Sequence, residues 1–101
     1  MAIHHTNAEH IREAIHFREP FAIASMSGTL KPAGWRIALN RLPIEYAESV
    51  YAAQYVVYSY GTAIAWWSED GGWIVPDTYY SNTTSGHQGI AKVGIAHGRL
   101  S

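Results

Sequence analysis

The chain has 101 residues and a formal net charge of −1, and 48% of its residues are hydrophobic while only 15% are charged. This length fits one domain with one hydrophobic core, and the composition is typical of a globular chain and excludes a disordered one. The sequence contains no cysteine, which excludes a disulfide framework, a thiolate zinc site and a cysteine nucleophile.

A helix is expected close to the start of the sequence. Thr6 and Glu9 have capping-box spacing, in which the hydroxyl and the carboxylate each satisfy a free backbone amide at a helix start. Apolar residues then recur every three or four positions, and Pro20 cannot continue a helix. The pattern therefore predicts a helix over about residues 7–18.

Two strands and a second helix are expected next. Residues 21–30 alternate with period two, which predicts a strand, and residues 31–34 have the composition of a turn. Residues 35–39 are then expected to pair back as a further strand. Pro43 suits the first turn of a helix, and the apolar spacing that follows predicts a short helix over residues 43–53.

The clearest strand signals lie in the second half of the chain. Residues 55–60 are β-branched or aromatic with one exception, and Gly61 separates them from a second such run at 64–67. The glycines of residues 69–72 tolerate the positive φ of a hairpin turn, which would lead to a short strand at 73–75. Three consecutive strands are therefore predicted here.

A last helix is expected over about residues 86–97, which Thr83, Thr84 or Ser85 would cap. Its glycines weaken it by about 1 kcal/mol each relative to alanine, so packing on the sheet must stabilise it. The predicted fold class is α+β, an antiparallel sheet of four to five strands with an N-terminal and a C-terminal helix packed on it.

Part of the sequence resembles a known family. The resemblance covers about residues 55–88 and is carried by three segments, Tyr58-Ser-Tyr-Gly-Thr-Ala-Ile-Ala-Trp66, Pro76-Asp77 and Tyr80-Ser-Asn-Thr-Thr-Ser-Gly-His-Gln88. The pattern is similar to that of small uncharacterised domains encoded by phages and some archaea, except at Ala63, where proline is common. The resemblance implies a phage origin and no known activity. It also singles out a polar group of five residues, Thr83, Thr84, Ser85, His87 and Gln88.

This polar group has two interpretations. Hydroxyl groups and free backbone amides at the positive end of a helix can bind phosphate or carboxylate, which would suit a nucleic acid or a nucleotide. The same side chains can equally cap the helix and pin it to the sheet, and this structural interpretation is the one we favour.

A small hydrolase is a further alternative for the same region. Asp77, His87 and a hydroxyl of Ser81, Thr83 or Ser85 supply an acid, a base and a nucleophile. However, the sequence lacks a nucleophile elbow, a phosphate-binding loop and a dinucleotide fingerprint, and one small domain has little room for a deep pocket. We therefore expect no enzyme activity and no cofactor.

The six histidines do not form a metal-binding motif. His10 and His16 lie six residues apart on the predicted N-terminal helix, which is not the i, i+4 spacing of a helical zinc site. No metal site is expected.

The aromatic residues lead to the preferred functional hypothesis. Adjacent strand residues point to opposite faces, so Trp66 and Trp67 should be divided between the two faces of the sheet, as should Tyr79 and Tyr80. Helices on both sides or a dimer partner could cover these rings. Alternatively, the rings form a recognition surface, since Tyr and Trp are frequent at interface hot spots. The candidate binding residues among them are Trp35, Trp66, Trp67 and Tyr79.

The expected partner is a protein of the host or the phage. Nucleic acid is a weaker alternative, because the seven basic residues are scattered and are balanced by eight acidic ones. The low charge also favours self-association, so a homodimer is a further expectation.

The whole sequence is expected to form a single domain over residues 1–101, flexible at 1–5. It shows no secretory signal and no membrane-spanning run, and we expect a cytoplasmic protein without membrane contact. The sequence thus predicts a small non-enzymatic accessory protein of phage type that binds a macromolecule through aromatic sheet residues.

Overall fold

The fold is a strand meander with one helix before it, a helical segment between its second and third strands, and one helix after it. A computed structural model describes residues 8–23, 25–78 and 80–97. The elements are α1 (Ala8–His16), β1 (Phe21–Ala22), β2 (Met26–Leu30), the 3-10 helix η1 (Ile44–Tyr46), α2 (Ala47–Ala52), β3 (Tyr55–Ser59), β4 (Thr62–Ser68), β5 (Gly72–Ile74) and α3 (Asn82–His97). The expected flexible start at residues 1–5 and the predicted cap at Thr6 lie outside the described residues.

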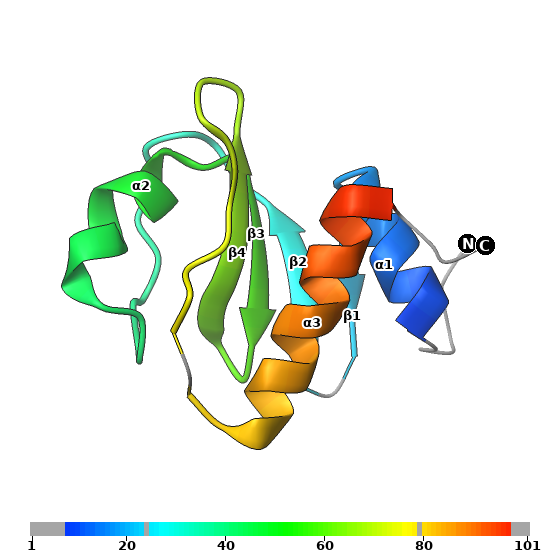
Figure 1. Ribbon diagram of the computed structural model, residues 1–101. Helices are drawn as coiled ribbons and strands as arrows, with labels where there is room; N and C mark the ends of the chain where they lie inside the picture. The colour runs from blue at the N-terminus through cyan, green and yellow to red at the C-terminus, as the bar shows by residue number, and fades with distance from the viewer. Residues whose placement is uncertain (1–7, 24, 79, 98–101) are drawn as a thin grey trace.

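All five strands belong to one antiparallel sheet. Their order is β1-β2-β3-β4-β5, so each strand pairs with its neighbour in the chain. With a helix at each end of the described chain, this confirms the α+β fold class and the antiparallel sheet (Figure 1).

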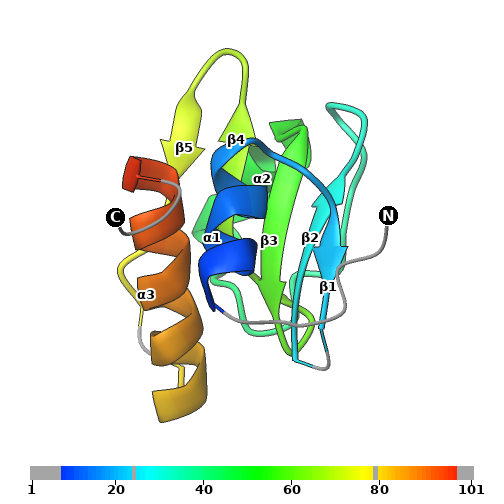
Figure 2. The ribbon, with the colours of Figure 1, turned by 90° about the vertical axis from the view of Figure 1, so that its right-hand side faces the viewer.

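Helices cover both faces of the sheet. α1 and α3 lie side by side on one face, while η1 and α2 lie against the other (Figures 1 and 2). Each face therefore has its own buried cluster: Ile11, Ile15 and Ala91 pack with sheet residues on the first face, and Leu42 and Val50 do so on the second. The prediction of one hydrophobic core was wrong, because two layers of helix enclose two cores.

A β-bulge sets which β4 side chains face which core. The register between β3 and β4 shifts between Val57 and Tyr58, which leaves Ile64 as an extra residue in β4. Ile64 and Ala65 therefore both contribute to the core under α1 and α3, whereas Trp66 contributes to the core under α2.

The strand predicted over residues 21–30 is in fact two short strands, β1 and β2, that pair with each other. Phe21 lies opposite Gly28, and the backbone N–H of Ile23 donates to the carbonyl oxygen of Met26 at 2.8 Å. A Cβ atom at Gly28 would collide with the Phe21 ring and with the hydroxyl group of Tyr55. The period-two pattern could not reveal the break, because both arms of a hairpin alternate in the same way.

Residues 35–39 do not form the predicted strand. The ammonium group of Lys31 donates hydrogen bonds to the carbonyl oxygens of Trp35 at 2.8 Å and Tyr51 at 2.6 Å, and burial lowers its pKa. Gly34 N–H also donates to the Tyr51 oxygen, at 2.8 Å. Tyr51 lies in the last turn of α2, where carbonyl groups lack helical partners. The loop is thereby fixed to the end of α2 and not to the sheet.

Gly94 permits close contact between α3 and α1. A Cβ atom at this position would lie 2.9 Å from the carbonyl oxygen of Arg12 and 3.2 Å from Cβ of Ile15. By contrast, a Cβ atom at Gly89 would meet nothing within 4 Å. None of the helices in the described ranges has the length and apolar character needed to cross a membrane.

Candidate functional site

The candidate tryptophans occupy very different environments. Trp66 is fully buried, and its Nε1–H donates to Oγ of Ser49 at 2.8 Å. Trp67 is half-buried on the opposite face, with the guanidinium carbon of Arg18 at 4.2 Å from its ring centroid. Trp35 is 65% exposed. A recognition role for Trp66 was therefore a wrong prediction, because its indole is enclosed by α2 and the sheet.

The sheet aromatics are covered by the protein's own helices. Tyr55 and Trp66 have no exposed surface, and Trp73 is half-buried against the core under α1 and α3. Among the described residues, the largely exposed rings of Trp and Tyr are those of Trp35 and Tyr60, and both lie outside the strands. The candidate residue Tyr79 lies outside the described residues. The largely exposed rings thus lie on loops, whereas Trp67 and Trp73 on the sheet are half-buried.

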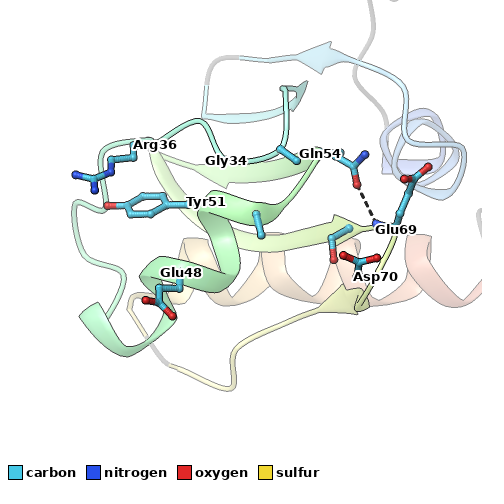
Figure 3. Close-up of a pocket in the computed structure, with 10 residues that line it drawn as sticks. Gly34, Arg36, Glu48, Tyr51, Gln54, Glu69 and Asp70 are labelled. Atoms are coloured by element: carbon cyan, nitrogen blue, oxygen red, sulfur yellow. Dashed lines mark hydrogen bonds between the residues drawn. The ribbon is translucent and has the colours of Figure 1, made fainter.

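An open groove, which we call the α2 groove, lies between the loop at residues 33–36, helix α2 and the turn from β4 to β5 (Figure 3). Its volume is about 610 Å³, within the usual range for ligand pockets. The Gln54 side chain accepts a hydrogen bond from the backbone N–H of Glu69 at 2.9 Å, which fixes the turn at one end. At the other end the guanidinium of Arg36 lies 5.6 Å from the centroid of the Tyr51 ring.

Charge is unevenly distributed along the α2 groove. Glu69 and Asp70 lie at one end, and Arg36 lies at the other beside Tyr51 (Figure 3). With Glu48, three carboxylates and one guanidinium line the groove, so two negative charges are left unbalanced. The Glu69 and Asp70 end can therefore attract a cationic group.

The polar group near residue 85 lies inside α3 and not before it. The helix begins at Asn82, about four residues earlier than predicted, and Oγ of Ser81 accepts a hydrogen bond from the backbone N–H of Thr84 at 3.1 Å. Ser81 is thus the capping residue, and the prediction of a cap at Thr83, Thr84 or Ser85 was wrong. The helix is about one turn longer than predicted because its capping residue, Ser81, precedes the three predicted ones in the sequence.

Thr84 and His87 connect α3 to the end of β3 through Ser59. The hydroxyl oxygen of Ser59 lies 3.1 Å from Oγ1 of Thr84 and 2.7 Å from Nδ1 of His87. Nε2 of His87 lies 3.5 Å from Oγ of Ser25, and the centroid of the His87 ring lies 6.0 Å from the centroid of the Tyr60 ring. Burial lowers the pKa of His87, which favours the neutral imidazole.

The other members of the polar group have separate roles. Gln88 is buried, and its Nε2–H donates to the carbonyl oxygen of Thr78 at 2.9 Å. Thr83 is exposed and Ser85 is half-buried. The structural interpretation therefore describes Thr84, His87 and Gln88 well, since all three hold α3 to neighbouring segments.

Sequence reasoning missed Ser59 and Ser25 as partners of His87. Ser59 carried a signal, because it is the one residue of 55–60 that is neither β-branched nor aromatic. Ser25 carried none. Ser59 is only 1% exposed, whereas Asp77 is exposed. In the described ranges, no group of three or more His, Cys, Asp or Glu side chains is placed to hold a metal ion.

A second, smaller cavity lies beside Ser59 and Thr84. We call it the Arg41 cavity. Its volume is about 100 Å³, and its lining residues are Arg41, Ser59, Tyr60, Thr62, Tyr80, Ser81 and Thr84. Nη2 of Arg41 donates to the carbonyl oxygen of Tyr80 at 3.3 Å, and its guanidinium carbon is 5.6 Å from the Tyr80 ring centroid.

These features define a small α+β domain in which a five-stranded meander carries the α2 groove and the Arg41 cavity. The chain belongs to a family of unknown function, DUF8033, whose sequence model matches residues 26–92. The match extends from β2 into α3 and includes the residues on which the sequence resemblance to uncharacterised domains depends. No curated protein and no solved structure matches the chain.

Proposed function

We propose that this protein is a small non-enzymatic accessory protein that binds a segment of another protein in the α2 groove. The observation that carries the proposal is the exposed Trp35 on a loop that is fixed in place. Its neighbours Gly34 and Arg36 line the groove, and Lys31 holds its carbonyl oxygen at 2.8 Å. A large aromatic ring on a rigid support loses little entropy on binding, and tryptophan is enriched at interface hot spots.

Charge complementarity indicates the chemistry of the partner segment. The unbalanced carboxylates at the Glu69 and Asp70 end favour a lysine or an arginine of the partner. The exposed Trp35 favours an apolar side chain a few residues away. The proposed occupant is therefore an extended segment that combines a basic residue with an apolar one.

The same charge argues against the alternative of nucleic acid in this groove. Phosphate groups are attracted by clusters of lysine and arginine, and most of the affinity for nucleic acid comes from such contacts. Here a single arginine, Arg36, lines the groove together with three carboxylates. A protein partner is accordingly the favoured ligand of this surface.

Three parts of the proposal rest on the sequence. The phage context, with a host or phage protein as partner, comes from the family resemblance. A cytoplasmic location is proposed with this context, and a homodimer is proposed from the low charge of the chain. Sedimentation velocity at high protein concentration tests the homodimer directly.

The binding proposal is tested with a displayed library of short random peptides, followed by fluorescence anisotropy with the enriched sequences. We expect enriched peptides to pair a basic residue with an apolar one and to lose affinity as salt rises. The Trp35→Ala and the Glu69→Gln, Asp70→Asn variants should each bind more than about tenfold more weakly.

The matched controls are Ile44→Ala and Glu45→Gln, which change exposed residues that do not line the groove. Both should bind like the parent protein. Equal affinity of all variants, or no enrichment of any peptide, would overturn the proposal, as would preferential binding of single-stranded DNA.

A further inference from the structure

The Arg41 cavity differs from the α2 groove in size and in chemistry. At about 100 Å³ it has room for several water molecules or for one small ion. Three polar side chains that line it are more than nine-tenths buried: Ser59 is 1% exposed, and Thr62 and Thr84 are each 4% exposed. The hydroxyl groups of Ser59 and Thr84 contact each other, and that of Thr62 accepts a hydrogen bond from the backbone N–H of Arg41 at 3.5 Å, so a network of buried hydroxyl groups lines the cavity.

The lining of the cavity favours an anion. Six of its seven residues carry a hydroxyl group, the seventh is Arg41, and none carries a carboxylate. A guanidinium has five N–H donors, and the hydrogen bond from Nη2 of Arg41 to the Tyr80 carbonyl oxygen uses one of them. Arginine binds the oxygens of phosphate in a bidentate manner, because the fork of its donors matches their spacing.

A hydrogen-bonded chain connects the cavity to His87. The chain runs from Nδ1 of His87 to Oγ of Ser59 over 2.7 Å, and from there to Oγ1 of Thr84 over 3.1 Å. Each hydroxyl donates one hydrogen. If Nδ1 carries a proton, Ser59 donates to Thr84, and the Thr84 hydrogen is then available to the cavity. If Nδ1 is unprotonated, Thr84 donates to Ser59 and presents only its lone pairs to the cavity.

We infer that the Arg41 cavity binds a phosphate group, held by the guanidinium of Arg41 and by the hydroxyl group of Thr84. His87 is a positioning residue in this site, because its tautomer sets the direction in which Thr84 donates. The site is separate from the α2 groove, so the phosphate inference does not depend on the proposed binding of a protein partner there.

The test is a titration of the full chain with inorganic phosphate, in which the amide chemical shifts are monitored by NMR. Chloride keeps the ionic strength constant throughout. We expect saturable shifts at the residues that line the cavity. Arg41→Gln and Thr84→Val should each weaken binding by at least about tenfold, since each removes a hydrogen bond to a charged ligand. Lys92→Gln, which removes one exposed positive charge elsewhere on α3, should bind like the parent protein.

A second readout separates binding from general charge screening. Long-range ¹⁵N spectra report the tautomer of His87, and phosphate should shift it toward the form with a proton on Nδ1.

Arg41 is exposed, so Arg41→Gln should fold even where Thr84→Val does not. A parallel titration with methyl phosphate shows whether the natural ligand is a phosphate monoester or free phosphate. Equal binding of both supports the monoester, and binding of inorganic phosphate alone supports the free ion. Shifts that fail to saturate, or that are equal in Arg41→Gln and Lys92→Gln, overturn the inference.

Discussion

Oγ of Ser59 lies 2.7 Å from Nδ1 of His87, although the two residues are 28 positions apart in the sequence. The contact joins the end of β3 to the second turn of α3. Because burial lowers the pKa of His87, the imidazole resists protonation as long as the protein is folded.

Stability should therefore decrease in mildly acidic solution. Below the ordinary histidine pKa of about 6.5, the unfolded chain binds a proton at His87 more readily than the folded protein does. The free energy of unfolding thus falls as the pH drops from neutrality toward the lower pKa of the folded state. His87→Asn should show a weaker decrease, because the amide can replace Nδ1 at Ser59 without titrating. Tm measured across this range checks the prediction, and identical pH profiles would show that His87 is not the titrating group.

Trp35 and Trp66 should respond in opposite ways to truncation. Trp66→Ala removes a fully buried ring and its hydrogen bond to Ser49, so we expect a loss of about 3–5 kcal/mol in the free energy of unfolding. Trp35→Ala removes an exposed ring, so the change should stay within about 0.5 kcal/mol. Denaturant unfolding measures both. Trp66→Phe is the milder substitute if the alanine variant does not fold, and a large loss for Trp35→Ala would contradict its placement on the surface.

Two glycines of α3 should give opposite results when changed to alanine. Gly94→Ala should destabilise the protein by about 1–3 kcal/mol, because the new methyl group would press on the backbone of Arg12 in α1. Gly89→Ala meets open space and should stabilise the helix by about 0.5–1 kcal/mol. Thermal unfolding of the pair compares the same substitution in one helix. If the two variants changed Tm in the same direction, the close approach of α1 and α3 would be wrong.

Lys31→Met should destabilise the loop that carries Trp35. The substitution leaves carbonyl oxygens of Pro32, Trp35 and Tyr51 without the ammonium donor, which should cost about 1–3 kcal/mol. Lys92→Met, at an exposed position of α3, should change stability by less than about 0.5 kcal/mol. Chemical denaturation measures the difference. Equal stability of the two variants would mean that Lys31 does not anchor the loop.

Local patterns predicted most of the fold. The β-branched and aromatic runs correctly indicated β3 and β4, and helical spacing indicated α1 and α2. The break between β1 and β2 could not be predicted, because both arms of a hairpin follow the same period-two pattern and the pairing of Phe21 with Gly28 becomes visible only in the fold. The loop at residues 35–39 was missed for a similar reason, since Lys31 binds a carbonyl group 20 positions away.

The candidate site was predictable only in part. Period-two alternation correctly divided Trp66 and Trp67 between the two faces of the sheet. It could not show that α2 encloses Trp66, because burial depends on the placement of a helix from another part of the sequence. The polar group around His87 was recognised, but Ser59, its nearest partner, became apparent only when β3 and α3 were placed together.

The pairing of the first helix with the last has a consequence for biosynthesis. β1 to β5 can assemble in order as they leave the ribosome, since each pairs with its neighbour in the chain. The face under α1 is completed only by α3, which is made last among the described elements. A nascent chain therefore carries an uncovered apolar face until α3 has left the ribosome, and resistance to proteolysis is gained when α3 packs on α1.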